Sequence, residues 1–149
     1  MSDACADTAH APGTETLRDL VLGTARTLRR RWVSTLQPWQ LSPHEFRALR
    51  VVEHDERPRL SAVARALHIA PRSATEVIDR LEERGLTERV PDEFDRRATC
   101  VRTTADGRRV LDELRSARDA DSDEFFAGIT DAERAELRRI LTKLHGGAS

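Results

Sequence analysis

Tyrosine is absent from this 149-residue chain, and aromatic residues make up only 4% of it. Charged residues, in contrast, make up 34%. Sheet sandwiches draw heavily on aromatic and β-branched residues, so this composition favours a mainly helical protein with solvated outer faces. The length fits a single domain that is large enough to bury a core.

An excess of charge of one sign is also lacking, since 25 Lys and Arg residues oppose 26 Asp and Glu residues. Net charge therefore gives no support for nucleic-acid binding, and any basic face must be local. Lys143 is the only lysine. Arginine is better suited than lysine to bidentate contacts with phosphate or guanine, although an arginine-rich genome would produce the same bias.

Cysteine is scarce, and Cys5 and Cys100 fit no metal-binding spacing, so we expect a reducing, cytoplasmic compartment. We see no targeting signal and no apolar run long enough to span a bilayer. His44 and His54 are off the i, i+4 spacing that places two metal ligands on one helix face, and nucleophile motifs and glycine-rich loops are missing. The sequence therefore predicts no metal, no cofactor and no enzymatic activity.

The remaining pattern is a succession of amphipathic helices behind a polar stretch, residues 1–13, which we expect to be a disordered tail. Pro38 ends the first helix, Ser42 begins the second with a capping box to Glu45, and Ser61 is the expected cap of the third. The predicted helices cover about residues 14–37, 42–54, 62–67, 71–84, 104–126 and 131–145.

The third and fourth helices are joined by a tight turn at residues 68–70, which is the signature of a helix-turn-helix. Two β-prone runs, 86–90 and 98–103, then flank the charged segment 91–97 and predict a β-hairpin with a charged tip. The expected fold is mainly α, a winged helix-turn-helix with a small β-hairpin wing over residues 42–103. N- and C-terminal dimerisation helices, 14–37 and 104–145, would flank it in a single domain over residues 14–149.

An outward face of the fourth helix and the hairpin tip carry the candidate DNA contacts. Apolar residues at helical spacing turn inward, so polar side chains at the start of the helix point outward, where they can reach phosphates and base edges in a major groove. At the tip, Asp95 can accept hydrogen bonds from an arginine and hold the loop, while Arg97 extends into a minor groove. These candidates are Arg72, Ser73, Thr75, Glu76, Arg80, Asp95, Arg96 and Arg97; the alternative is an ordinary solvated surface.

Four segments, 67–75, 79–86, 95–98 and 103–107, read LHIAPRSAT, DRLEERGL, DRRA and TTADG. In this order and spacing they resemble the MarR (multiple antibiotic resistance regulator) family. The resemblance implies a transcriptional repressor that binds a palindromic operator as a homodimer and is released by a small-molecule effector, often an aromatic anion. The sequence departs from the common family pattern at Ala70, Pro71 and Glu76, which bears on operator sequence and affinity.

The terminal helices provide more apolar face than a monomer of this size needs, and the resemblance implies that they interlock with a second chain. The alternative is an ordinary core within one chain. The candidate dimerisation residues are Leu17, Leu20, Val21, Leu137, Ile140, Leu141 and Leu144.

An aromatic group could line an effector pocket near the junction of the dimerisation and DNA-binding regions, although aromatic residues at helical spacing also serve as simple core. The candidates are Trp32, Trp39, His44 and Phe46. Cys100 is expected to be buried on a wing strand, and a thiol-based redox sensor is a weaker alternative. A second alternative is a winged-helix module used only for protein association.

Overall fold

Helices dominate the computed structural model, which describes residues 15–146, and its two strands form one antiparallel hairpin. A mainly helical chain with a single hairpin is what the sequence predicted, so that prediction is confirmed. The elements are α1 (Leu17–Leu36), η1 (Gln37–Trp39), α2 (Pro43–His54), α3 (Leu60–Leu67), α4 (Pro71–Glu83), β1 (Thr87–Pro91), β2 (Thr99–Thr103), α5 (Ala105–Phe125), η2 (Phe126–Gly128) and α6 (Asp131–Gly146).

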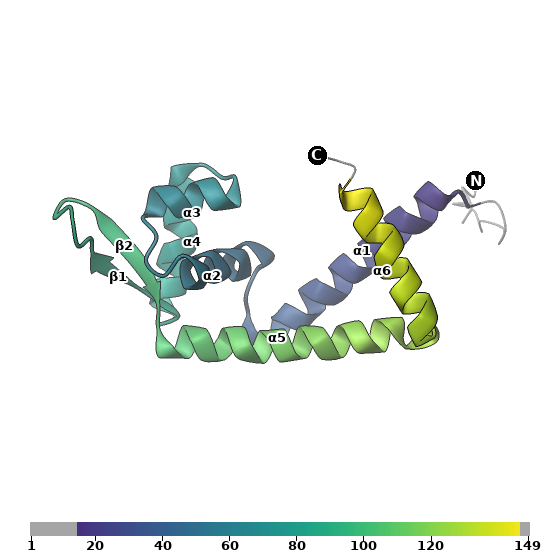
Figure 1. Cartoon of the computed structure of the whole chain (residues 1–149). Coiled ribbons are helices and arrows are strands. Elements are labelled where there is room, and N and C mark those ends of the chain that lie inside the picture. The colour runs from purple at the N-terminus through teal and green to yellow at the C-terminus, as the bar shows by residue number, and fades with distance from the viewer. Residues whose placement is uncertain (1–14, 147–149) are drawn as a thin grey trace, which may run out of the picture.

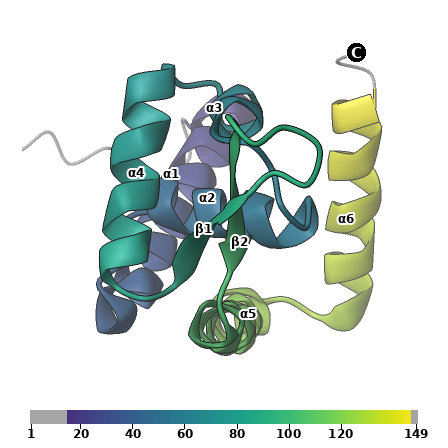
Figure 2. The same ribbon diagram turned by 90° about the vertical axis from the view of Figure 1, so that its left-hand side faces the viewer.

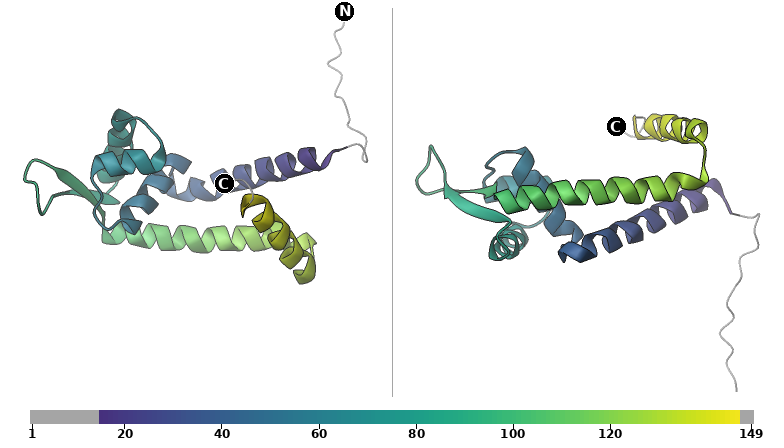
Figure 3. Two further views of the ribbon diagram at one scale, coloured as in Figure 1. Left: turned by 45° about the horizontal axis from the view of Figure 1, so that its top comes forward. Right: turned by 90° about the horizontal axis from the view of Figure 1, so that it is seen from below.

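The long helix α5 runs along one side of the molecule and connects its two ends (Figure 1). Helices α2, α3 and α4 and the hairpin gather at one end, and α6 lies with the start of α1 at the other. The views in Figure 3 show the same separation, with the hairpin projecting away from the body. The end-on view in Figure 2 places α4 and α6 on opposite sides of the hairpin.

Local capping signals explain where the helices begin. Ser42 and Glu45 form the predicted capping box, in which Glu45 Oε2 accepts the Ser42 backbone N–H at 2.7 Å. Thr16 and Asp19 form an equivalent box at the start of α1. At α5, the Thr104 hydroxyl accepts the N–H of Gly107 at 3.0 Å.

The core lies at the winged-helix end, where α2, α3, α4, the hairpin and the first half of α5 meet. Leu49, Ile78 and Leu114 are fully buried there, one from each of α2, α4 and α5. Trp32 of α1 packs on the edge of this core. Helix α6 contributes no buried residue, so nothing within the chain's core holds it in place.

One predicted helix start was wrong. Helix α3 begins at Leu60 with Arg59 as its N-cap, instead of beginning after a capping Ser61. The reason is a long-range contact, because Arg59 forms an antiparallel bridge with Cys100 and Pro58 accepts the Val101 N–H at 3.0 Å. This isolated bridge beside the hairpin keeps the backbone extended up to Arg59, and helix α3 starts directly after Arg59.

The other boundaries differ from the predicted ones by a few residues at most. Pro38 ends α1 as expected, but the chain continues through the 3-10 turn η1 before α2. The predicted tail, 1–13, lies outside the described residues. Among residues 15–146, no helix has the length and apolar character needed to cross a membrane, and no three His, Cys, Asp or Glu side chains group as metal ligands would.

Candidate nucleic-acid interface

The turn between α3 and α4 presents the first residues of α4 to solvent. His68 adopts a left-handed conformation with φ 55° and closes α3 through its N–H, which donates to the carbonyls of Ala64 and Arg65. Ala70 is extended, and Pro71 occupies the first helical position. Ala74, Val77, Ile78 and Leu81 are buried, as predicted. The opposite side of α4, which carries the candidate contacts, is therefore turned outward.

Two of these outward side chains already interact with each other. Arg72 Nε lies 3.3 Å from Glu76 Oε1, one turn along the helix, and the Arg72 side chain is 92% exposed. Thr75 donates its hydroxyl to the Pro71 carbonyl at 3.0 Å. An exposed pair of this kind is worth at most about 1 kcal/mol, so a phosphate or a guanine can displace Glu76 from Arg72 at little cost.

Arg80 differs from the residues before it, because it joins α4 to α2. Its Nε donates to Glu45 Oε1 at 3.0 Å, and the Glu45 side chain is only 9% exposed. Burial by itself would raise the pKa of Glu45, but hydrogen bonds from Ser42 and the Arg80 guanidinium outweigh it and lower the pKa. A DNA contact of Arg80 stays a prediction, and the structure gives the side chain a positioning role.

The end of α4 is tied down as well. Arg84 donates to the carbonyl of Gln40 at 2.8 Å and to that of Trp39. The indole N–H of Trp39 donates in turn to Glu113 Oε2 on α5 at 2.9 Å. This chain of contacts connects the helix proposed to read DNA to α5, and sequence periodicity gives no signal of it.

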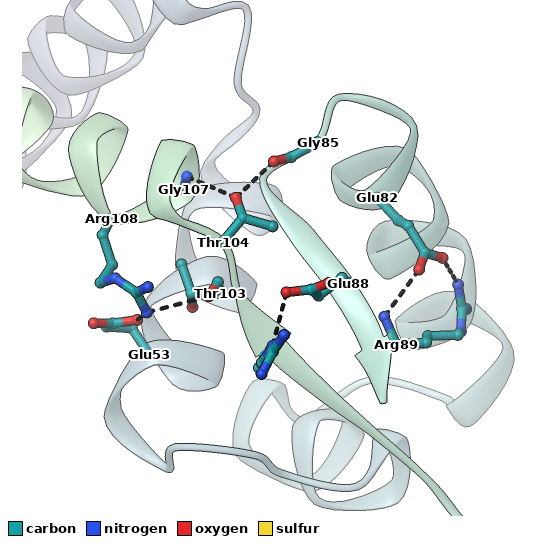
Figure 4. Close-up of polar contacts among 10 residues, drawn as sticks. Glu53, Glu82, Gly85, Glu88, Arg89, Thr103, Thr104, Gly107 and Arg108 are labelled. Carbon is teal, nitrogen blue, oxygen red and sulfur yellow. Dashed lines mark hydrogen bonds and ion pairs between the residues drawn. The ribbon is translucent and has the colours of Figure 1, made fainter. Parts of the chain in front are cut away.

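The wing is joined to α4 through Arg89 of β1, which donates to Glu82 (Figure 4). Arg89 also donates to Asp79 at 2.6 Å. The hairpin pairs Thr87 with Thr103 and Pro91 with Thr99 at its two ends. These ion pairs and the hydrogen bond from the Arg89 backbone N–H to Glu82 join the wing to α4.

At the tip of the wing, the hydrogen bonds of Asp92 and Asp95 differ from the predicted ones. Asp95 was expected to hold an arginine, and it does accept a hydrogen bond from Arg97, but through the backbone N–H, at 3.0 Å. The guanidinium held at the base of the tip is that of Arg59, which donates to Asp92 at 2.8 Å. No local pattern in the sequence marks Asp92, because its partner Arg59 is 33 residues away.

Asp92 is the centre of the tip. Its Oδ1 accepts the backbone N–H groups of Phe94 and Asp95, both at 2.9 Å. Its Oδ2 accepts from Arg59 and, at 3.4 Å, from the Cys100 thiol. The Arg59 bond and these N–H groups hold the pKa of Asp92 well below its usual range. Asp92 thereby fixes the wing against the start of α3.

We expect Asp92→Asn to destabilise the protein near pH 6 and to remove part of its acid sensitivity. A carboxyl with a lowered folded-state pKa stabilises the fold above its unfolded pKa, and this contribution is lost as the pH falls toward the folded value. Thermal melts at pH 6 and pH 2.5 should therefore show a smaller drop in the variant than in the unmodified protein. Asp112→Asn, which removes an exposed carboxylate on α5, is the control, and equal drops in both variants would contradict the assignment.

Cys100 is buried on β2, as expected. Burial, together with the nearby Asp92 carboxylate, raises the pKa of its thiol. A raised pKa disfavours the reactive thiolate, so Cys100 has the character of a core residue and not of a sensor. Cys5 lies outside the described residues.

The structure does not gather the four candidate effector residues around one cavity. Trp32 and Phe46 meet edge to face with ring centroids 4.8 Å apart, at the edge of the core. Trp39 is bonded to α5, and His44 is exposed on the first turn of α2. A cavity of about 260 Å³ does lie between α2 and α5, and its lining includes one candidate, Phe46, with Arg50, Glu53, His54, Leu111, Arg115 and Arg118.

The seven candidate dimerisation residues are all exposed in the single chain, from 36% for Leu137 to 77% for Leu17. They lie on α1 and α6, and none of them belongs to the core described above. The apolar faces of these helices are therefore left uncovered by the chain's own core.

Comparisons with known proteins agree with this architecture. The model of the MarR family matches residues 41–99, which run from just before α2 to the first residue of β2. A putative transcriptional regulatory protein for the hcr operon of Thauera aromatica is 30% identical over 105 residues, 70% of this chain and 63% of that protein, so the match spans under two thirds of the relative's length.

Two solved structures are similar over most of their length. A MarR family protein from Bacillus stearothermophilus is 26% identical with a TM-score of 0.77, covering 88% of this chain and 91% of that one. A mutant of MarR from E. coli in complex with operator DNA has a TM-score of 0.67 at 22% identity, covering 86% and 92%. The family consists of transcriptional regulators and not of enzymes. Residues 41–99 thus match the MarR family, and the fold of the described chain is that of MarR-type winged-helix transcriptional regulators.

Proposed function

We propose that the protein is a homodimeric repressor that binds a palindromic operator and is released from it by a small-molecule effector. The observation that carries the DNA contact is the joint exposure of the first turns of α4 and of the wing tip, with the two held in one unit by Arg89. A helix start entering a major groove, with a basic tip in the adjoining minor groove, is the arrangement that this exposure supports.

Charge at the two surfaces supports the same assignment. Within residues 15–146, no carboxylate lies within 4 Å of the guanidinium of Arg96 or Arg97, although most other arginines near the wing are in ion pairs. The DNA contacts we propose are Arg72, Ser73, Thr75, Glu76, Arg80, Asp95, Arg96 and Arg97. Asp95 acts by fixing the Arg97 backbone, and Arg80 acts partly through Glu45.

The uncovered apolar faces of α1 and α6 support the proposed homodimer. Pairing two chains through Leu17, Leu20, Val21, Leu137, Ile140, Leu141 and Leu144 would bury these apolar side chains and place two recognition helices for half-sites about one helical turn apart. In this arrangement residues 42–103 form the DNA-binding lobe, and 14–37 with 104–145 form the dimerisation region.

The proposed effector is a small aromatic anion, and the cavity between α2 and α5 suits one. Arg50, Arg115 and Arg118 supply positive charge, and the Phe46 ring supplies an apolar surface. The Arg50 guanidinium already lies over that ring, 5.8 Å from its centroid. Of the four aromatic or histidine candidates, Phe46 is thus the proposed contact, while Trp32, Trp39 and His44 would act from outside the cavity.

The test is binding of the purified protein to the intergenic DNA upstream of its own gene, measured by fluorescence anisotropy across a salt series. Saturable binding that weakens with salt and exceeds that to random DNA supports the proposal. Benzoate added to the complex should release the DNA. Equal, weak binding to all duplexes would contradict the proposed operator binding and favour the alternative, a winged-helix module used only for protein association.

We expect Arg97→Ala to weaken this binding about tenfold and to reduce the slope of log K against log salt by about 1, because one cationic contact is lost. Arg138→Ala, which removes an exposed arginine of α6, should leave both quantities unchanged. If the two variants bind alike, Arg97 does not contact the DNA.

A further inference from the structure

One exposed aromatic side chain has no role in the interfaces described so far. The exposed large apolar side chains of residues 15–146 lie on α1 and α6, with the exception of Phe94. Phe94 is 95% exposed in the segment between β1 and β2. The hairpin that these strands form lies at the other end of the molecule from α6 (Figure 1). A dimer formed through α1 and α6 would leave this ring in water.

The backbone that carries Phe94 is braced. Its N–H donates to Asp92 Oδ1 at 2.9 Å, as does the N–H of Asp95. Ala98 donates its N–H to the Asp95 carbonyl at 2.9 Å and closes the tip. The ring is thus presented from a loop whose backbone is held by hydrogen bonds, which reduces the backbone entropy to be lost when the ring makes a contact.

The acidic and basic side chains around the ring differ in the contacts they make. Each acidic side chain of the tip is engaged: Asp92 by Arg59, Glu93 by Arg57 at 2.5 Å, and Asp95 by the Arg97 N–H. Among the charged side chains of the tip, those of Arg96 and Arg97 have no ion pair within the described residues, and they follow the ring after Asp95. The tip therefore offers one apolar ring with two guanidinium groups.

A DNA minor groove is the surface that matches this set. Its phosphate walls attract guanidinium groups, and its floor and sugar edges accept apolar side chains, which can wedge between base steps. A partner protein would also cover a ring, but two free cations beside it favour a polyanion.

We propose that Phe94 is an apolar wedge that enters the minor groove beside Arg97 and packs against a base step, so that the wing reads how readily that step opens. The inference rests on the proposed function and adds a specificity-determining residue to it. Pyrimidine–purine steps such as TA and CA open most easily, and A-tracts resist deformation. The protein should therefore prefer a TA or CA step under each wing tip.

The experiment compares Phe94→Ala, Phe94→Leu and Arg97→Ala on the upstream duplex after footprinting has located the bound site. Loss of the ring should weaken binding about tenfold without changing the salt slope, because no counterion release is lost. Leucine should restore most of the affinity, since it can also act as a wedge. The melting temperature should be the same for all three free proteins, because both side chains are exposed.

A second duplex, in which the step under the wing is replaced by an A-tract, makes the test specific. Wild-type protein should bind it more weakly, and Phe94→Ala should bind both duplexes equally. If Phe94→Ala binds as wild type does while Arg97→Ala is weakened, the wedge is overturned and the proposed function stands. If wild-type protein shows no salt-dependent binding to the upstream DNA, the proposed function is overturned, and the wedge that rests on it is overturned as well.

Discussion

Replacing Gly107 by alanine should lower the free energy of unfolding by about 3 kcal/mol, the upper end of the usual cost of overpacking. Gly107 lies in the first turn of α5, where a Cβ atom would come within 2.1 Å of the Leu86 carbonyl oxygen and 2.7 Å of Thr103 Cγ2. The oxygen belongs to the backbone and accepts the Thr104 N–H at 3.1 Å, so it cannot move aside alone.

The damage should spread beyond the helix, because this contact joins α5 to the wing. The Thr104 hydroxyl accepts the Gly107 N–H and donates to the Gly85 carbonyl at 2.6 Å (Figure 4). An added methyl group would push the start of α5 away from the loop between α4 and β1. DNA binding should therefore weaken together with stability.

Urea denaturation followed by circular dichroism measures the effect. Gly128→Ala is the matched control, because a Cβ atom there meets nothing within 4 Å. The control should unfold at nearly the same urea concentration as the unmodified protein. Equal midpoints for the two variants would show that α5 can shift without cost, contrary to the close approach at Leu86.

The double substitution Ile140→Asp and Leu141→Asp should convert the proposed dimer to a monomer and weaken operator binding about 100-fold or more. Both side chains are exposed in the single chain, at 41% and 40%, so two charges there do not disturb the core. In a dimer they would be buried without partners. Binding would then lose the gain in effective concentration that comes from linking two half-site contacts.

Helix α6 itself should lose helicity in this variant. It is 16 residues long and places no residue in the core, and isolated helices of that length are marginal in water. Sedimentation velocity and far-UV circular dichroism measure the two effects. Ala135→Asp with Thr142→Asp adds the same charges to the outer face of α6, and this control should remain dimeric. A dimer that survives Ile140→Asp and Leu141→Asp would place the interface elsewhere.

Features set by neighbouring residues were predictable from the sequence. The capping box of Ser42 and Glu45, the buried stripe of α4 and the turn at residues 68–70 all depend on spacings of three or four residues, which a sequence displays directly. The wing strands were placed to within one residue for the same reason. The apolar residues Leu137, Ile140, Leu141 and Leu144 also lie on one face of α6 because of their spacing of three and four residues.

Contacts between distant segments were not predictable in this way. Arg59 bridges to Cys100 and thereby moves the start of α3, and Asp92 takes the guanidinium that was sought at Asp95. In the sequence pattern Arg80 is one more outward-facing arginine of α4, and only the fold places Glu45 beside it. Trp32, Trp39, His44 and Phe46 share an aromatic character that suggested a common pocket, but the direction of each side chain depends on packing between helices.

Helix α5 spans 21 residues without interruption, which corresponds to a rod of about 30 Å. It holds the winged-helix lobe at one end and leads to α6 at the other, and Trp39 and Arg84 fasten the recognition helix to it. A tilt of about 6° at one end of such a rod moves the other end by about 3 Å, close to the 3.4 Å rise between base pairs. In the proposed dimer, small angular changes where the two chains meet would therefore be enough to shift each α4 by about one base-pair step along the DNA.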